Sequence, residues 1–259
     1  MSKIEWTTQS YITVGKHKIP CDPDIKDGYH QGSGIKKVSR IKSSVKSIVW
    51  PAFNLRNKLL IDGFIGAEIG KLIKRYIQPD STFLEIGCGD MSLSKFVDPP
   101  QWYNGLDLEL TEFHIKRNYN YKSNLNIVLA SAAQIPAKDS IADLLVSTET
   151  LEHIPEIDQS VQEIHRLAKN KAIFICSIPN NYCHKYIKKG PHQGHINNWT
   201  YDEFINYMGE YGFELVEGFM KGVWIPLPMW LTKASYQVPL STSQEYYNTN
   251  FFYVFRVKK

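Results

Sequence analysis

Short apolar segments with strand character alternate with helical patterns between residues 80 and 180, and this alternation constrains the fold more than any other feature of the chain. The expected strands cover residues 82–86, 102–106, 126–130, 142–147 and 171–177. Helical segments lie between them; one of these, residues 160–168, places Val161, Ile164 and Leu167 on one face. Alternating strands and helices predict a mostly parallel sheet with right-handed crossovers. We therefore expect an α/β fold with helices on both faces of the sheet.

The last part of the chain predicts a further helix and a strand of opposite direction. Thr200 has the character of an N-cap, and Glu203 completes a capping box for a helix over 201–211 that Gly212 ends. The segment 251–257 alternates in polarity, and no helix long enough for a standard crossover precedes it. We expect this final strand to enter the sheet antiparallel.

The length of 259 residues suits one large domain with added lobes. Residues 1–50 are polar and basic, with lysines and an arginine clustered over 36–46, and are expected to form an irregular N-terminal extension. This extension is either a solvated arm or a lid or substrate lobe. Residues 51–259 are expected to form the main domain, with helical spacing of apolar residues over 54–76 and a substrate-shaping insertion at 220–250.

Composition limits the class of protein to which the chain can belong, but it does not identify a binding partner. A net charge of +4, from 30 Lys+Arg and 26 Asp+Glu, does not require a nucleic-acid partner. The sequence has no secretory signal pattern and no apolar run of about 18 residues, so we expect a soluble cytoplasmic protein without a membrane span. Its four cysteines form no C-x-x-C pair and are expected to be reduced.

A glycine loop at 83–90, Phe-Leu-Glu-Ile-Gly-Cys-Gly-Asp, follows the first expected strand. Gly87 and Gly89 let the backbone approach a ligand, and a helix expected to begin near Met91 would offer free N–H groups. Asp107 ends the next strand, where a carboxylate can accept both hydroxyls of a ribose. This combination predicts a nucleoside-containing cofactor. Ser92 occupies the position where a dinucleotide fingerprint requires a third glycine, which disfavours a nicotinamide dehydrogenase.

With Glu85 two residues before the first glycine, the loop resembles motif I of class I S-adenosylmethionine-dependent methyltransferases of type 11/23. Residues 131–136 resemble the D-A-x-x-L-P segment of that family, with Ser131 in place of Asp, and residues 148–154 resemble its E-x-L-E-H-I run. The resemblance covers residues 60–219. It implies a Rossmann-like, seven-stranded sheet with a C-terminal antiparallel strand, and S-adenosylmethionine as cofactor. The cofactor-binding residues that follow from the motifs are Glu85, Gly87, Cys88, Gly89, Asp107, Leu108, Ser131, Ala132 and Ser147.

The E-x-x-E-H run suggests where the methyl group is transferred. In a helix, Glu149, Glu152 and His153 would share one face and could bind a divalent metal such as Mg²⁺ with His195 or His192. Together with the later H-x-x-H segment, this run resembles metal-dependent O-methyltransferases, including those of small RNAs and of the ubiquinone pathway. Alternatively, His153 or His195 is a catalytic general base, or the run is structural.

These features favour O-methylation of a small-molecule or glycan hydroxyl. One alternative is an RNA 2′-O-methyltransferase that uses a divalent metal, with the basic cluster at 36–46 as a nucleic-acid contact. Another is a cofactor-binding but inactive regulatory subunit, suggested by Ser131. The sequence leaves the oligomeric state open.

Overall fold

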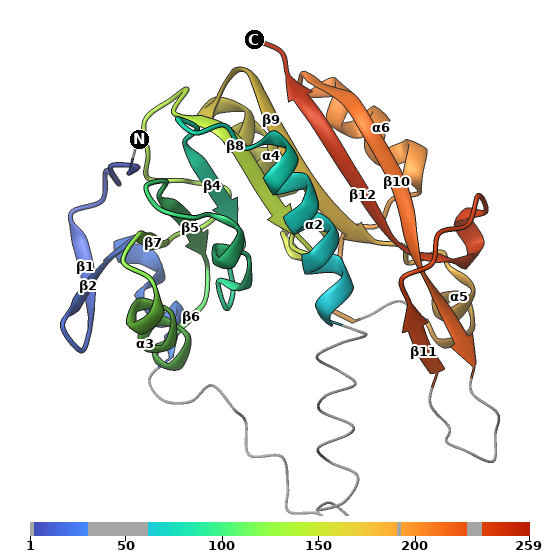
Figure 1. Ribbon diagram of the computed structural model, residues 1–259, viewed down its shortest axis with the longest axis horizontal. Helices are drawn as coiled ribbons and strands as arrows, with labels where there is room; N and C mark the ends of the chain where they lie inside the picture. Colours follow the sequence, from blue (N-terminus) through green and yellow to red (C-terminus); the bar gives the residue numbers. More distant parts are fainter. Residues whose placement is uncertain (1–2, 31–61, 191–192, 227–234) are drawn as a thin grey trace, which may run out of the picture.

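The structure, a computed structural model, describes residues 3–30, 62–190, 193–226 and 235–259 (Figure 1). Within these residues one large sheet runs through the molecule in the strand order β1-β2-β7-β5-β4-β8-β9-β12-β10-β11. A separate two-stranded sheet pairs β3 (Tyr29–His30) with β6 (Leu110–Thr111). The expected α/β class is confirmed.

Five parallel strands form the centre of the large sheet. They are β7 (Leu125–Leu129), β5 (Tyr103–Asp107), β4 (Phe83–Ile86), β8 (Ala142–Thr148) and β9 (Ala168–Pro179). All five coincide with the expected strands to within a few residues. Most residues of these strands are buried, as expected for parallel strands that are covered on both faces.

The C-terminal strand runs against its neighbours, as expected. β12 (Asn248–Val257) pairs antiparallel with β9 and also with β10 (Phe213–Pro226). Seven adjacent strands of the sheet, in the order β7-β5-β4-β8-β9-β12-β10, form the expected seven-stranded core. β1, β2 and β11 extend this core, so the sheet in the described part of the chain has ten strands instead of seven.

The N-terminal extension is more regular than expected. β1 (Ser10–Val14) and β2 (His17–Cys21) form an antiparallel hairpin, and β2 meets β7 at Cys21 and Leu129. A short 3-10 helix, η1 (Pro23–Gly28), follows the hairpin. The hairpin thus adds strands to the sheet edge, so the expectation of an irregular segment is wrong here. The basic cluster at 36–46 lies outside the described residues.

Helices cover both faces of the sheet, as expected. α2 (Asp62–Tyr76), which lies in front in Figure 1, and α3 (Glu112–Tyr121) contribute buried residues to one hydrophobic cluster. α4 (Ile157–Leu167) and α6 (Tyr201–Glu210) contribute to the other cluster. The expected helix over 54–76 is described only from residue 62.

Local capping explains where α6 begins and ends. The Thr200 side chain accepts a hydrogen bond from the Glu203 N–H, while the Glu203 carboxylate accepts one from the Thr200 N–H. After the helix, Gly212 adopts a φ of 84°, in the left-handed region that glycine tolerates. The predicted capping box and glycine stop are both confirmed.

The segment 220–250 forms part of an antiparallel extension. β10 continues to Pro226 and pairs with β11 (Ser235–Val238), and a short 3-10 helix, η4 (Glu245–Tyr247), precedes β12. Residues 227–234 lie outside the described part. That this segment shapes a substrate site stays a prediction.

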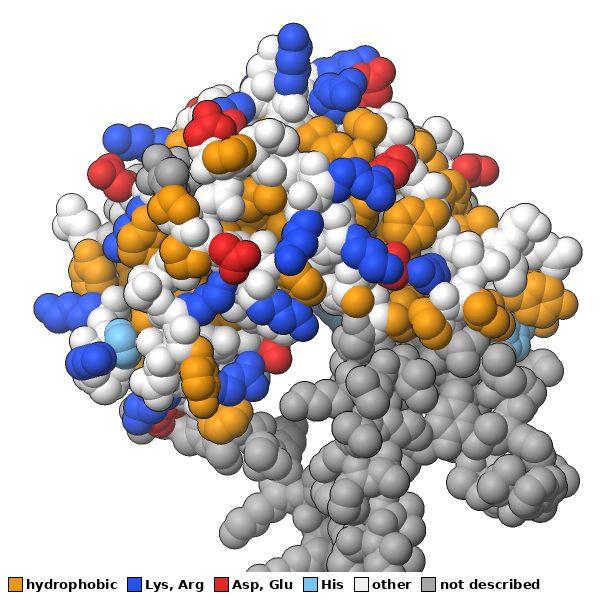
Figure 2. All heavy atoms as spheres, viewed as in Figure 1, with side chains coloured by type: hydrophobic (Ala, Val, Ile, Leu, Met, Phe, Trp, Pro, Cys, Tyr) orange, Lys and Arg blue, Asp and Glu red, His pale blue; other side chains and the backbone are white. Residues whose placement is uncertain are grey.

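The molecular surface mixes charges of both signs. Figure 2 shows basic and acidic side chains interspersed with hydrophobic ones on one face. Among the described residues, no helix combines the length and apolar character needed to cross a membrane. The four cysteines are buried and unpaired by disulfides, which fits the expectation of reduced thiols.

Candidate active site

A cavity of about 810 Å³ lies at the carboxyl ends of the central strands. Its walls come from the loop after β4, the end of β5 and the loops after β7 and β8. Of the nine predicted cofactor-binding residues, eight line it: Glu85, Gly87, Cys88, Gly89, Asp107, Leu108, Ser131 and Ala132. Ser147 does not; its side chain is fully buried, and the next residue, Thr148, lines the cavity instead. This is the edge where ligands of open α/β sheets bind.

The glycine loop has a backbone that only glycine adopts easily. Gly87 and Gly89 have φ values of 74° and 45°. A Cβ on Gly87 would lie 2.3 Å from the Thr150 Oγ1 atom, whereas a Cβ on Gly89 would meet no atom within 4 Å. Gly87 therefore allows close packing against the loop after β8, and Gly89 leaves its side of the loop open.

The segment after the loop is shorter than expected. Met91 has a φ of 59°, and the chain then forms only a 3-10 helix, η2 (Ser92–Phe96). The expectation of a regular helix here is wrong: the segment makes only 3-10 turns, and the backbone is extended again at Val97, whose N–H donates to the Ser94 carbonyl.

Asp107 lies beside the glycine loop, as the spacing suggested. Its Oδ2 atom accepts a hydrogen bond from the Gly89 N–H at 2.6 Å, and its Oδ1 atom accepts one from the Glu109 N–H at 2.9 Å. Burial raises the pKa of this carboxyl above its ordinary value, while the two backbone N–H groups oppose the rise. The carboxylate is thus held at the edge of the cavity.

Glu85 also lines this cavity. Its carboxyl group is buried and accepts a hydrogen bond from the Tyr103 hydroxyl. Burial raises the pKa of Glu85 well above its ordinary value. Ser131 also lines the cavity, and its hydroxyl accepts a hydrogen bond of 3.2 Å from the Ala133 N–H.

The charge of the cavity points to the kind of cofactor that it suits. Its lining carries six acidic residues, and no lysine or arginine lines it in the described part of the chain. The acidic residues are Glu85, Asp90, Asp107, Glu109, Glu149 and Glu156. Burial raises the pKa values of Glu85, Asp107 and Glu149 and so reduces their share of the negative charge, but the lining as a whole still disfavours a pyrophosphate and favours a cofactor with positive charge. The chemistry thus favours a nucleoside that carries an ammonium or sulfonium group.

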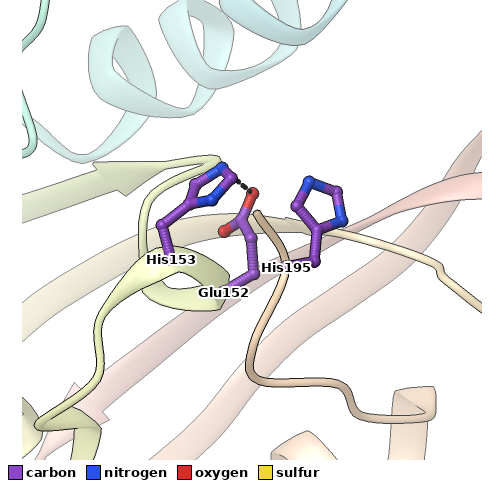
Figure 3. A group of neighbouring side chains, drawn as sticks. All are labelled: Glu152, His153 and His195. Carbon is purple, nitrogen blue, oxygen red and sulfur yellow. Dashed lines mark ion pairs between the residues drawn. The ribbon is translucent and has the colours of Figure 1, made fainter. Parts of the chain in front are cut away.

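Three of the four predicted metal ligands come together next to the cavity. Glu152, His153 and His195 each offer a ligand atom, and these atoms lie within 4.8 Å of one another. Figure 3 shows the Glu152 carboxylate between the two imidazole rings. The ring centroids of the histidines are 4.9 Å apart, and the His153 Nε2 atom lies 3.7 Å from the Glu152 Oε1 atom. His153 lines the cavity, whereas His195 does not.

Hydrogen bonds set the tautomer of both histidines. The Nδ1 atom of His153 lies 2.7 Å from the Gly194 carbonyl oxygen, which can only accept. The Nδ1 atom of His195 lies 2.8 Å from the Oδ1 atom of Asn181, whose amide nitrogen donates to Asn198. Both neutral rings therefore carry the proton on Nδ1 and the lone pair on Nε2.

Glu152 is buried without hydrogen-bond partners for its carboxyl group. It is 1% exposed, and neither Oε1 nor Oε2 has such a partner. Burial, together with the nearby charge of Glu149, raises the pKa of Glu152 well above its ordinary value. A buried carboxyl in this state is costly unless a proton or a cation compensates its charge.

Glu149 does not belong to this cluster. The expected helix over 149–153 is wrong: only Leu151–His153 form a 3-10 helix, η3, and Glu149 has a φ of 49° outside it. The Glu149 carboxylate accepts hydrogen bonds from Ser177 Oγ at 2.8 Å and Asn250 Nδ2 at 2.9 Å. Burial raises the pKa of Glu149 to about 7. The left-handed turn directs this side chain toward β9 and β12.

Sequence patterns did not identify the residues that hold these groups in place. Asn250 donates a hydrogen bond to Glu149, from which it is 101 residues away in the sequence. No local motif predicts this contact. Asn181, which orients His195, is the second residue after the end of β9. Its place near the carboxyl end of a central strand was the one sequence signal for a role in the site. His192 lies outside the described residues.

Comparison with known proteins agrees with the geometry of the site. The model of a methyltransferase domain family matches residues 61–218. A ubiquinone/menaquinone biosynthesis C-methyltransferase, UbiE, of Rickettsia akari is 26% identical over 163 residues, which cover 57% of this chain and 66% of that protein. The chain thus spans about two-thirds of that relative's length.

Two further similarities are of the same kind. A probable S-adenosylmethionine-dependent methyltransferase of Mycolicibacterium smegmatis is 29% identical over 99 residues, which cover 38% of this chain and 37% of that protein. Among solved structures, a putative methyltransferase in complex with the Haloferax volcanii Trm112 activator superposes with a TM-score of 0.60 at 14% identity, covering 85% of this chain and 100% of that chain. The last similarity concerns the fold alone.

Proposed function

The chain belongs to the class I S-adenosylmethionine-dependent methyltransferases, and we propose that it methylates a hydroxyl oxygen of a small molecule or a glycan. When bound, S-adenosylmethionine supplies a methyl group on a sulfonium centre. The observation that carries the proposal is the imidazole of His153 on the wall of the acidic cavity, with His195 beside it.

The chain's own residues suit the cofactor. Asp107 would hold the ribose hydroxyls, and the loop at Gly87 and Gly89 would approach the methionine part. The loop at Ser131 and Ala132 would border the adenine. The acidic lining offsets the positive charge of the sulfonium and the ammonium group.

His153 is the residue best placed to accept the proton of an acceptor hydroxyl. Its basic Nε2 atom belongs to a ring whose orientation the Gly194 carbonyl fixes, and 43% of the side chain is exposed. A neutral imidazole is suited to general-base work near neutral pH. His195 would support His153 from a position outside the cavity lining.

The proposal is tested with labelled cofactor and a panel of hydroxylated small molecules and glycans. We expect label transfer to oxygen, and a loss on the order of 100-fold in kcat for His153→Ala with little change in affinity for S-adenosylhomocysteine. A labelled product methylated on carbon, as the name of the UbiE relative suggests for that protein, would reject oxygen as the acceptor. Full turnover in both His153→Ala and His195→Ala would show that neither histidine is the general base.

A second candidate role for the same cluster is supported by the buried Glu152 carboxyl group. Glu152, His153 and His195 would hold a divalent cation, which would supply Lewis acidity toward a substrate hydroxyl. Both imidazoles donate Nδ1–H to an oxygen, as metal-bound histidines do. Two nitrogens and one carboxylate suit Mn²⁺ better than Mg²⁺, which prefers oxygen ligands.

Cation binding is measured without reference to activity. Titration of the chelator-treated protein with Mn²⁺, followed by the loss of the free-ion electron paramagnetic resonance signal, should give one site per chain. Glu152→Gln should abolish this site. Glu156→Gln, an exposed acid on the cavity wall, should leave it intact. If the unaltered protein shows no saturable Mn²⁺ binding, the proposed cation site is rejected. The general-base mechanism would then be the remaining proposal.

A further inference from the structure

A second cavity, of about 650 Å³, lies at the opposite end of the strands from the cofactor cavity. Trp102, on its wall, immediately precedes β5, and Leu125 begins β7, so the cavity borders the amino ends of both strands. The outer wall consists of residues 3–6 and the β1–β2 hairpin. The two cavities share no lining residue.

The charge of the second cavity is opposite to that of the first. Lys3, Lys16, Lys18 and His17 line it, with Glu5 as the one acidic lining residue among those described. Within the described part of the chain, the ion pairs join other residues, so no carboxylate neutralises these three lysines. Figure 2 shows basic side chains along the edge of the molecule where Figure 1 places β1 and β2. Several positive charges around a concave surface attract anions.

Aromatic rings line the same cavity, and contacts within the protein fix them. The indole N–H of Trp6 donates a hydrogen bond of 3.1 Å to Asn126 Oδ1. The Lys3 Nζ atom lies 5.1 Å from the centroid of the Trp102 ring. The ring of Tyr119 lies 4.4 Å, centroid to centroid, from that of His17. Fixed rings beside lysines suit a ligand that combines a planar ring with a phosphate.

We propose that this cavity binds a phosphorylated nucleoside, either a free nucleotide or the phosphorylated end of an RNA. Lys16 and Lys18 lie two residues apart on the hairpin and would contact the phosphate. The indole of Trp6 or Trp102 would stack on the base. This site lies apart from the methyl-transfer site and does not depend on which acceptor that site uses.

The test uses the full chain saturated with S-adenosylhomocysteine, so that nucleosides cannot enter the cofactor cavity. Tryptophan fluorescence reports binding, because two of the lining residues are tryptophans. We expect saturable binding of uridine 5′-monophosphate that weakens with salt, and about tenfold weaker binding of uridine. A 5′-phosphorylated hexauridylate that binds about tenfold tighter than the mononucleotide would identify an RNA end; equal affinity would identify a free nucleotide.

A matched pair of double variants locates the site. Lys16→Glu/Lys18→Glu should weaken binding of the mononucleotide about tenfold or more. Lys74→Glu/Lys171→Glu makes the same change in net charge at exposed positions outside both cavities and should change binding less than about twofold. Unchanged affinity for S-adenosylhomocysteine checks the fold. Equal weakening in both variants, or no saturable binding of either phosphorylated probe at millimolar concentration, would overturn the proposal.

Discussion

The carboxylate of Asp107 accepts a hydrogen bond of 2.6 Å from the backbone N–H of Gly89. This contact ties the end of β5 to the glycine loop that follows β4. One residue therefore does two things: it shapes the loop and presents a carboxylate to the cavity. A carboxylate has about four lone-pair positions, so the bonds to Gly89 and Glu109 leave capacity for the hydroxyls of a ribose.

Replacing Asp107 should therefore weaken cofactor binding strongly. Asp107→Ala removes the charged acceptor, and hydrogen bonds to charged groups contribute about 1.5–3 kcal/mol each. We expect the Kd for S-adenosylhomocysteine to rise by about 10–100-fold in calorimetry. The exposed Asp80→Ala serves as control and should bind as the unaltered protein does. Wild-type affinity in Asp107→Ala would show that the ribose lies elsewhere.

The two glycines of the loop should respond differently to alanine. Both have positive φ, which costs roughly 1–2 kcal/mol for an L-residue. Only at Gly87 does the added Cβ also collide with Thr150, and overpacking adds about 1–3 kcal/mol. Chemical denaturation should therefore show a larger loss of unfolding free energy for Gly87→Ala than for Gly89→Ala. Equal losses of unfolding free energy in the two variants would mean that Thr150 and its loop move aside for the added Cβ at little cost.

The contribution of Glu149 to stability should fall as pH rises from about 4.5 to about 7. Burial raises its pKa to about 7 in the folded state from 4.5. Between these values the folded protein binds the proton and the unfolded chain does not, so raising the pH favours unfolding. Above pH 7 both states are ionised, and the contribution of this group levels off.

Glu149→Gln measures that contribution. In urea denaturation with a chelator present, the variant should lose less stability than the unaltered protein between pH 5 and pH 8. One pKa unit corresponds to about 1.4 kcal/mol, so the difference has an upper bound on the order of 3 kcal/mol. Identical pH profiles for the two proteins would contradict the raised pKa of Glu149.

Periodicity and turn chemistry predicted most of the fold. The central strands contain short apolar segments separated by helical patterns, and the sequence of α6 carries its capping box and glycine stop. The β1–β2 hairpin was missed because its two strands have only five residues each, alternate between more and less buried positions, and lie in a segment that is polar and basic as a whole. β2 joins the sheet through tertiary contact with β7, which local sequence does not encode.

For the candidate site, too, one part could be predicted from the sequence and another part could not. The predicted cofactor-binding residues lie in the glycine motif and at the ends of neighbouring parallel strands, so the pairing of β4 with β5 brings Gly89 and Asp107 together. The acceptor side depends on backbone detail that spacing does not reveal. The positive φ of Glu149 separates this residue from Glu152 and His153, although helical spacing would have grouped them.

A buried pair of asparagines should control how the N-terminal segment attaches to the sheet. Asn104 is fully buried; its Oδ1 atom accepts hydrogen bonds from the Ile4 N–H at 2.9 Å and from Asn126 Nδ2 at 2.7 Å. Its own amide nitrogen donates to the Phe83 carbonyl at 2.8 Å. Asn126 in turn donates to the Ile4 carbonyl at 2.9 Å and accepts from the Trp6 indole. Residues 3–6 are thus held to β4, β5 and β7 by one network.

Asn104→Ala should leave several buried polar groups without partners, each costing about 1–3 kcal/mol. We expect unfolding free energy to fall by about 2–4 kcal/mol and the fluorescence of Trp6 to shift toward that of an exposed indole. Because residues 3–6 also line the second cavity, binding of uridine 5′-monophosphate should weaken while S-adenosylhomocysteine binds as before. The exposed Asn120→Ala should change none of these quantities. If Asn104→Ala loses stability but keeps full nucleotide affinity, residues 3–6 stay in place without this network.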